Sequence, residues 1–324
     1  MTDEQRQMVR WHLKRAQIAD HAVMGERYRV QARPIEDVPV PPFTDKGEAQ
    51  QWFREERRNL VSLTAFAAQN QWHFETWALA EAMWAYFTTG GQYEDAEYTY
   101  RLAAEAAEED ANPVAQIRMM LLLGQTLTDA LQFTEAGRVL TDTLAAAERL
   151  GDHVLIGTAL EFNGRLELKR ERYATALAWF ERATANAHKQ IELGVGTPRV
   201  LGLQLWFLAQ SRRGLGELDL AAELFEQARD QLALANDWRT GVMVEIEAAL
   251  LALRTDVDGA AGRVEDALGL AHDLGIALPL AQGRHQFALL SAEPERTEHL
   301  EKALALYESI GDAGADEVRK LLGR

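Results

Sequence analysis

The sequence predicts an all-α fold, a solenoid of about six helix hairpins of about 40 residues each. Its composition leans on Ala, Leu, Glu, Gln and Arg, which favour helices, whereas runs of β-branched residues are scarce. A length of 324 residues exceeds what one compact core usually needs, so it indicates either two globular domains or an extended array. Self-similarity from about Phe74 onward favours the array.

The first 70 residues precede the repeats as two helices joined by a proline-rich connector. Residues 3–26 are predicted to form a helix whose apolar side chains are only loosely grouped on one side. Residues 33–43 hold four of the eight prolines, and because proline fixes φ and lacks an amide donor, this connector must be extended. Asp45 and Glu48 provide an N-cap and an acidic first turn for a second helix that ends near Gln69.

Each repeat has a large residue at a turn, an Ala three residues later in most copies, and a second large residue after that. The Ala lets two helices approach closely, and the large residues fill the space between hairpins. In the first copy, Gly91 stands two residues before the first large residue. The turn positions are Tyr93, Phe133, Tyr173, Leu218, Val257 and Arg296, spaced by 40, 40, 45, 39 and 39 residues.

The division of the chain follows from this pattern. A hairpin can bury its apolar face only against the next hairpin, so the end of the stack needs a cap. We therefore expect N-terminal helices in residues 1–70, repeats in residues 71–312 and a capping helix in residues 313–324. The dense aromatic stripe of Trp77 and Trp84 is interpreted as the seam between the N-terminal helices and the first repeat.

The spacing of the second helix in each hairpin resembles that of the tetratricopeptide repeat (TPR). In that family the first helix carries a small residue at its centre. In four of the six repeats a small residue stands nine positions before the turn position, and these residues are Gly124, Gly164, Ala209 and Ala248. The resemblance implies a right-handed superhelix whose first helices line a concave groove. The longer period implies longer helices or turns than in a standard TPR.

A narrower resemblance rests on the stretch from Trp52 to Val61 and on the hairpin ends Leu150-Gly-Asp and Ile310-Gly-Asp. These segments resemble the C-terminal TPR region of bacterial, chiefly actinobacterial, STAND (NB-ARC) regulators of the AfsR/SARP-like type. In such proteins the TPR region is the sensor for an attached ATPase and DNA-binding module. Neither a Gly-x-x-x-x-Gly-Lys-Ser/Thr motif nor a plausible helix-turn-helix occurs in this sequence.

The net charge of −16 argues against direct binding to nucleic acid or to anionic membrane, since no Lys/Arg-rich block offsets it. The first 25 residues are charged throughout, and no run of 18 uncharged apolar residues occurs, so we expect neither secretion nor membrane insertion. Without cysteine, disulfides and thiolate zinc sites are excluded. The expected location is the cytoplasm.

No catalytic arrangement emerges. The eight histidines show no i, i+3 or i+4 pair that would converge on a metal. The glycines at 194–196 and 214–216 fall at predicted helix ends, where glycine supplies a C-cap, and no Gly-x-Ser-x-Gly elbow occurs. We therefore predict no metal, no cofactor and no enzymatic activity.

The candidate site is the predicted groove. Its residues are those on the side of each first helix that faces away from the apolar side used for packing. A cationic strip with an available Trp206 suits an extended peptide or an acidic helix. Guanidinium groups bind carboxylates through paired hydrogen bonds, and an indole ring can serve as a hydrophobic anchor for the ligand. Glu81 is predicted to flank the strip. The predicted groove residues are Arg118, Gln125, Asp129, Glu161, Arg165, Lys169, Trp206, Gln210, Arg213, Glu245 and Arg284.

A structural interpretation of the same residues stays open, in which Arg165 and Arg118 pair with Glu161 and Asp129 while Trp206 belongs to the core. The predicted function is a non-catalytic TPR sensor or scaffold that recognises a peptide, a protein segment or a small inducer in bacterial transcriptional or signalling regulation. The alternatives are an autoinhibitory docking module for a STAND ATPase and an accessory protein of a biosynthetic enzyme. The sequence leaves the oligomeric state open.

Overall fold

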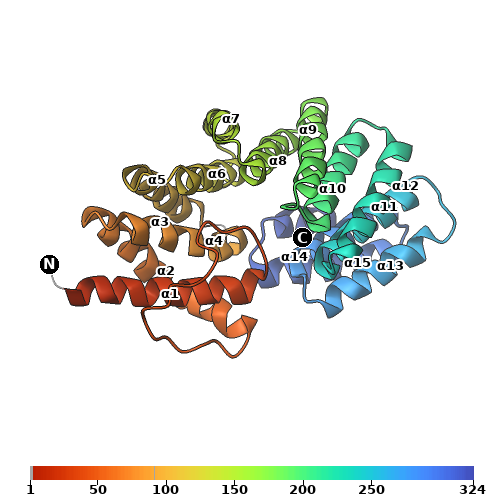
Figure 1. The fold of residues 1–324 in the computed structure, drawn as a ribbon. Helices are drawn as coiled ribbons and strands as arrows, with labels where there is room; N and C mark the ends of the chain where they lie inside the picture. The colour runs from red at the N-terminus through yellow and green to blue at the C-terminus, as the bar shows by residue number, and fades with distance from the viewer. Residues whose placement is uncertain (1–2, 91) are drawn as a thin grey trace. The chain divides into compact units, whose positions relative to one another are not determined.

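The structure, a computed structural model, describes residues 3–90 and 92–324 (Figure 1). Residues 1, 2 and Gly91 lie outside the described residues, so the place of Gly91 in the first repeat is not tested. The described residues form helices α1 to α16 and no strand, as the sequence predicts. None of the helices in these ranges is long and apolar enough to cross a membrane. Two compact units share the chain, Met1–Arg170 and Glu171–Arg324.

The first unit begins with the two helices and the connector expected from the sequence. Helix α1 spans Asp3–Met24 and α2 spans Lys46–Gln69. Asp45 caps α2, because its Oδ1 accepts a hydrogen bond from the Glu48 amide at 2.9 Å. The Glu48 carboxylate in turn accepts a hydrogen bond from the amide of Thr44, the residue before the cap, at 2.6 Å. The other helices of this unit are α3 (His73–Ala82), α4 (Trp84–Gly90), α5 (Tyr93–Glu109), α6 (Pro113–Asp129), α7 (Phe133–Leu150) and α8 (His153–Lys169).

The second unit continues the alternation of helices. The turn positions found in the sequence are the first residues of α5, α7, α9 and α11, whereas α13 begins three residues after Val257. Its helices are α9 (Tyr173–Glu192), α10 (Pro198–Gly214), α11 (Leu218–Leu234), α12 (Trp238–Arg254), α13 (Ala260–Asp273), α14 (Ala277–Leu290), α15 (Glu295–Ile310) and α16 (Gly314–Leu321). Helix α16 buries Val318 completely within an apolar cluster that includes Ala281 and Tyr307.

The 40-residue period comes from the lengths of the helices and of the turns between them. Among the described residues, six helices of the repeats have 17 residues and six of the turns between them have three, each of these turns with one residue in the left-handed region. In the first unit these left-handed residues recur every 20 positions, at Ala111 (φ 52°), Leu131 (φ 61°) and Gly151 (φ 75°). The 45-residue spacing arises because α9 has 20 residues and five residues separate it from α10. Both the helices and their turns therefore set the length of the repeat.

Close helix contact explains the small residue that the sequence pattern places in the first helix. A Cβ atom built on Gly124 of α6 would lie 2.3 Å from Cδ2 of Leu140 in α7, and Leu140 is fully buried. Gly137 of α7 differs, because a Cβ there would meet Leu166 at an ordinary 3.6 Å. Only the first of these glycines is needed for packing.

The two glycines give a matched test. We expect Gly124→Ala to lower the free energy of unfolding by about 1–3 kcal/mol, because the buried Leu140 has no space to move into. We expect Gly137→Ala to raise it by about 0.5–1 kcal/mol through helix propensity. Urea unfolding followed by circular dichroism measures both. A stability gain from both substitutions would contradict the close contact between α6 and α7.

Candidate functional site

A cavity of about 150 Å³ lies between α6 and α8, the first helices of two consecutive hairpins in the first unit. On α6, Thr128 and Asp129 follow Gln125 by three and four residues, and on α8 the lining residues are three, four and seven apart, so the side chains on each helix leave the same side of it. Four of the lining residues belong to the groove predicted from the sequence, although their role in binding stays a prediction. The cavity is lined by Gln125, Thr128 and Asp129 of α6 and by Phe162, Arg165 and Lys169 of α8.

The cavity, called the α6–α8 pocket below, combines acceptors and donors. Gln125 Oε1 is buried and has no hydrogen-bond partner. Burial raises the pKa of Asp129, although the positive charges of Arg165 and Lys169 oppose this effect. Arg165 lies 3.7 Å from the carboxylate of Glu161, one turn earlier on α8. The pocket therefore suits a ligand group that both donates and accepts hydrogen bonds, such as a peptide backbone.

Arg118 does not lie on an accessible surface, so its expected place on the open cationic strip is wrong. Only 5% of the residue is exposed, and its Nε lies 3.6 Å from Oε1 of Glu81 on α3. Its guanidinium carbon also lies 5.7 Å from the centre of the Trp84 ring. The partner is thus Glu81 and not Asp129, the partner that the structural interpretation assigned to it.

In the second unit, three predicted residues of α10 converge on one carboxylate of α12. Glu247 Oε1 accepts from Trp206 Nε1 at 3.0 Å and from Gln210 Nε2 at 2.8 Å. Glu247 Oε2 lies 2.8 Å from a terminal guanidinium nitrogen of Arg213. Trp206 is 8% exposed and stacks on Phe207, in agreement with the interpretation of this indole as core. Sequence reasoning missed Glu247.

The expected inward placement of Glu245 is wrong. Its carboxylate accepts from Arg229 of α11 at 3.0 Å and from Arg263 of α13 at 2.9 Å, so it faces the second helices of the hairpins. Arg284 of α14 lies beside the second helix α15, with a terminal nitrogen 3.3 Å from Nδ1 of His299. Within residues 3–90 and 92–324, no group of three or more His, Asp or Glu side chains is placed to hold a metal ion.

Solved structures with the same fold include proteins with peptides bound. No family model and no curated protein matches the sequence. A Rap protein complexed with Competence and Sporulation Factor is 12% identical, with a TM-score of 0.60 over 82% of this chain and 74% of that one. The Rap conjugation gene regulator of plasmid pLS20, in complex with the Phr* peptide, is 14% identical, with a TM-score of 0.59 over 90% and 82%.

A third similar structure is a STAND protein with a tetratricopeptide repeat sensor from Pyrococcus horikoshii. It is 16% identical, with a TM-score of 0.55 over 85% of this chain and 44% of that one. At such low identity these similarities establish the fold alone. The chain therefore has a TPR-like helical-repeat fold, which confirms the fold class predicted from the sequence.

The raised pKa of Asp129 leads to a test of the pocket. A carboxyl group whose pKa is raised by folding stabilises the native state only while protonated, so ionised Asp129 disfavours folding at neutral pH. We expect Asp129→Asn to raise the free energy of unfolding at pH 7 by on the order of 0.5 kcal/mol. The gain should shrink as the pH falls through the pKa of Asp129, which lies above 3.8.

Urea unfolding between pH 7 and pH 4 measures this effect. Asp142→Asn is the control, because Asp142 is exposed on α7 and lies 3.6 Å from Arg138. This control should leave stability unchanged or slightly lower. A loss of stability in Asp129→Asn at pH 7 would show that ion pairing of Asp129 with Arg165 and Lys169 outweighs the cost of burying its charge.

Proposed function

We propose that the protein is a non-catalytic TPR-like binding module that recognises an extended peptide or protein segment on the face of its first helices. The observation that carries this proposal is the α6–α8 pocket, where an unpartnered buried acceptor, Gln125 Oε1, lies with Asp129, Arg165 and Lys169. The Rap structures of similar fold support it, because they hold Competence and Sporulation Factor and the Phr* peptide.

The chemistry of the pocket fits a peptide. An extended backbone presents N–H and C=O groups in alternation, so Gln125 and Asp129 accept from its amides while Arg165 and Lys169 donate to its carbonyls or to an acidic side chain. A cavity of about 150 Å³ holds a group the size of one side chain. The pocket thus acts as the anchor for one residue of a longer segment.

The proposed biological setting is bacterial transcriptional or signalling regulation in the cytoplasm, without direct contact to nucleic acid or membrane. The stretch from Trp52 to Val61, which resembles STAND regulators, and the fold shared with a STAND sensor support this setting. An autoinhibitory docking surface for a separate ATPase would use the same face. Co-purification of a P-loop ATPase that the pocket variants below release would favour that alternative.

Selection from a library of short random peptides displayed on phage, with the full chain as target, tests the function. We expect selected peptides to bind in fluorescence anisotropy titrations and the double variant Arg165→Glu, Lys169→Glu to weaken them at least about tenfold, since it reverses both pocket cations. Gln125→Leu should also weaken binding without lowering the melting temperature, because its Oε1 loses no partner.

Arg138→Glu is the matched control, since Arg138 is an exposed arginine on the second helix α7 and lies outside the pocket. It should leave the affinity unchanged. Peptides that bind the double variant as tightly as the original chain would place the site elsewhere. A small molecule retained in native mass spectrometry, with no peptide selected, would replace the peptide proposal by the small-inducer alternative.

A further inference from the structure

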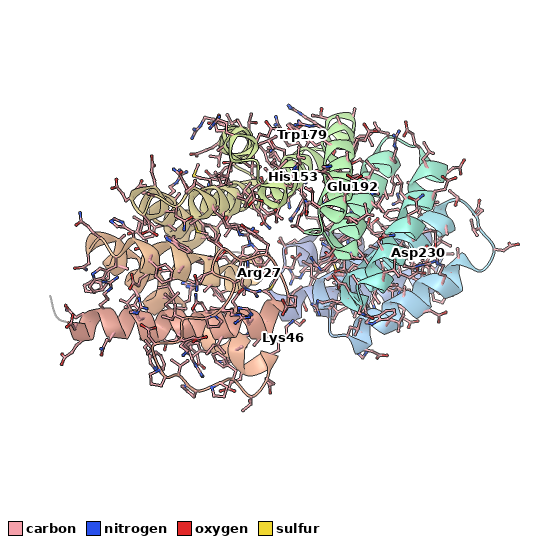
Figure 2. All side chains as sticks on the ribbon, in the orientation of Figure 1. Arg27, Lys46, His153, Trp179, Glu192 and Asp230 are labelled. Carbon is pink, nitrogen blue, oxygen red and sulfur yellow. The ribbon has the colours of Figure 1, made fainter. Side chains whose placement is uncertain are left out.

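A short stretch of the chain contacts Glu81 of α3 and Arg118 of α6, two residues predicted to lie in or beside the groove. Residues 27–31, called the strap below, begin two residues after the left-handed Gly25 (φ 60°), which follows the last residue of α1. Figure 2 labels Arg27 on this stretch. The strap contacts α1, α3, α4 and α6 of the first unit, and all its contacts described below fall within that unit.

The backbone of the strap is held by one carboxylate. Glu81 Oε1 accepts from the Val30 amide at 2.9 Å, and Glu81 Oε2 accepts from the Gln31 amide at 3.2 Å. Glu81 is 3% exposed, so both bonds form away from water. A side chain of a repeat helix thus binds two successive backbone amides of the strap, so these two bonds do not depend on the side chains of Val30 and Gln31.

Two arginines of the strap supply the specific contacts. Arg27 donates to both carboxylate oxygens of Asp20 on α1, at 2.8 and 2.9 Å, and its guanidinium carbon lies 4.3 Å from the centre of the Trp84 ring. Arg29 Nε donates to the same carboxylate at 2.6 Å. Asp20 is 1% exposed and Arg29 is 8% exposed. The receptor side therefore consists of Asp20, Glu81 and Trp84.

The strap lies next to the open pocket. Its Tyr28 ring is 5.9 Å from the guanidinium carbon of Arg118 on α6. Gln125 of the pocket lies seven residues further along α6, on the same side and about 10 Å away. The face of the first unit thus has a covered section at Glu81 and Arg118 and an open section at the pocket.

Charge in the covered section is incompletely balanced. Within residues 3–90 and 92–324, the ion pairs of the Arg27, Arg29 and Arg118 guanidinium groups are made with Asp20 and Glu81, so three positive groups share two carboxylates. Burial and the nearby Arg118 lower the pKa of Arg27 to about 10, in spite of Asp20. The Nε atoms of Arg27 and Arg118 and the indole N–H of Trp84 are buried without a hydrogen-bond partner. These unsatisfied donors subtract from the free energy that the strap gains through its ion pairs and through the bonds of Arg27 and Arg29 to the carbonyls of Glu81 and Gly25.

We propose that Asp20, Glu81 and Trp84 form a binding site for an extended Arg-x-Arg segment, and that the strap fills this site as an internal, exchangeable ligand. The site takes a basic peptide, because it offers two carboxylates to two arginines and an indole face to one of them. A second consequence rests on the proposed function: the strap shortens the groove that a partner anchored in the pocket can use.

The site is tested with a fluorescein-labelled peptide of residues 26–32. A short tether gives the strap an effective concentration of the order of millimolar, so the labelled peptide should not bind the unaltered chain at micromolar concentration. The variant Arg27→Ala, Arg29→Ala empties the site, and we expect it to bind the peptide with a Kd of about 100 µM or tighter. The same peptide with alanine at both arginine positions should bind at least about tenfold more weakly.

A second variant empties the site by a different change, so that the test does not depend on correct folding of the first variant. Val30→Pro removes one amide donor to Glu81 and leaves every charge in place, so it should bind the labelled peptide and speed hydrogen exchange at the Gln31 amide. Val38→Pro, in the proline-rich connector that follows the strap, should do neither. Lack of peptide binding by both strap variants, when circular dichroism shows them folded, overturns the proposal, as does equal binding by the unaltered chain.

The effect on the groove is measured separately, with a peptide selected for the pocket. The variant Val30→Pro should bind it at least about tenfold more tightly than the unaltered chain if the strap restricts access. Equal affinity would overturn the restriction and leave the Arg-x-Arg site intact. If no pocket peptide is selected at all while the 26–32 peptide binds the emptied site, the proposed function fails and the Arg-x-Arg site stands.

Discussion

The structure depends on one constraint: a helix hairpin of this chain cannot bury its own apolar face and must stack on its neighbours. Close stacking needs small residues where helices cross, and the contact between Gly124 and Leu140 shows how little space remains there. Once these contacts fix the rotation of each helix, the side turned away from them is fixed as well. The α6–α8 pocket and the strap both lie on positions set in this way.

Polar side chains on that side either find a hydrogen-bond partner on the neighbouring first helix or remain without one. Trp206, Gln210 and Arg213 all meet Glu247, so a group that resembled a binding surface in sequence is satisfied internally. Gln125 meets no such partner and keeps an unsatisfied oxygen. An unsatisfied buried acceptor is unfavourable for folding, which is why it indicates a ligand better than exposed charge does.

The sequence predicted what depends on regular periods and missed what depends on single turns and on distant contacts. Four turn positions are helix starts, and four of six pocket residues were predicted. The prediction for Glu245 was wrong because Val257, taken as the turn position, lies inside the turn before α13, three residues after α12 ends instead of the four found after α6, α8 and α10. The position in α12 that corresponds to Trp206 of α10 is Ile246, because each lies eight residues after the first residue of its helix. The prediction was therefore one residue away, and one residue rotates a side chain about the helix axis by about 100°. The burial of Arg118 needed the strap and Glu81, which are separated from it by tens of residues.

Under the proposed function, the strap and the pocket together determine how this face would select a partner. A tethered strap at an effective concentration of the order of millimolar excludes any weak basic segment that meets the site at micromolar concentration. A partner that also enters the pocket gains a second attachment, so its own Arg-x-Arg segment would compete at a comparable effective concentration. Selection then rests on the spacing between the two contacts, about two helical turns along α6 between Arg118 and Gln125, more than on the strength of either one.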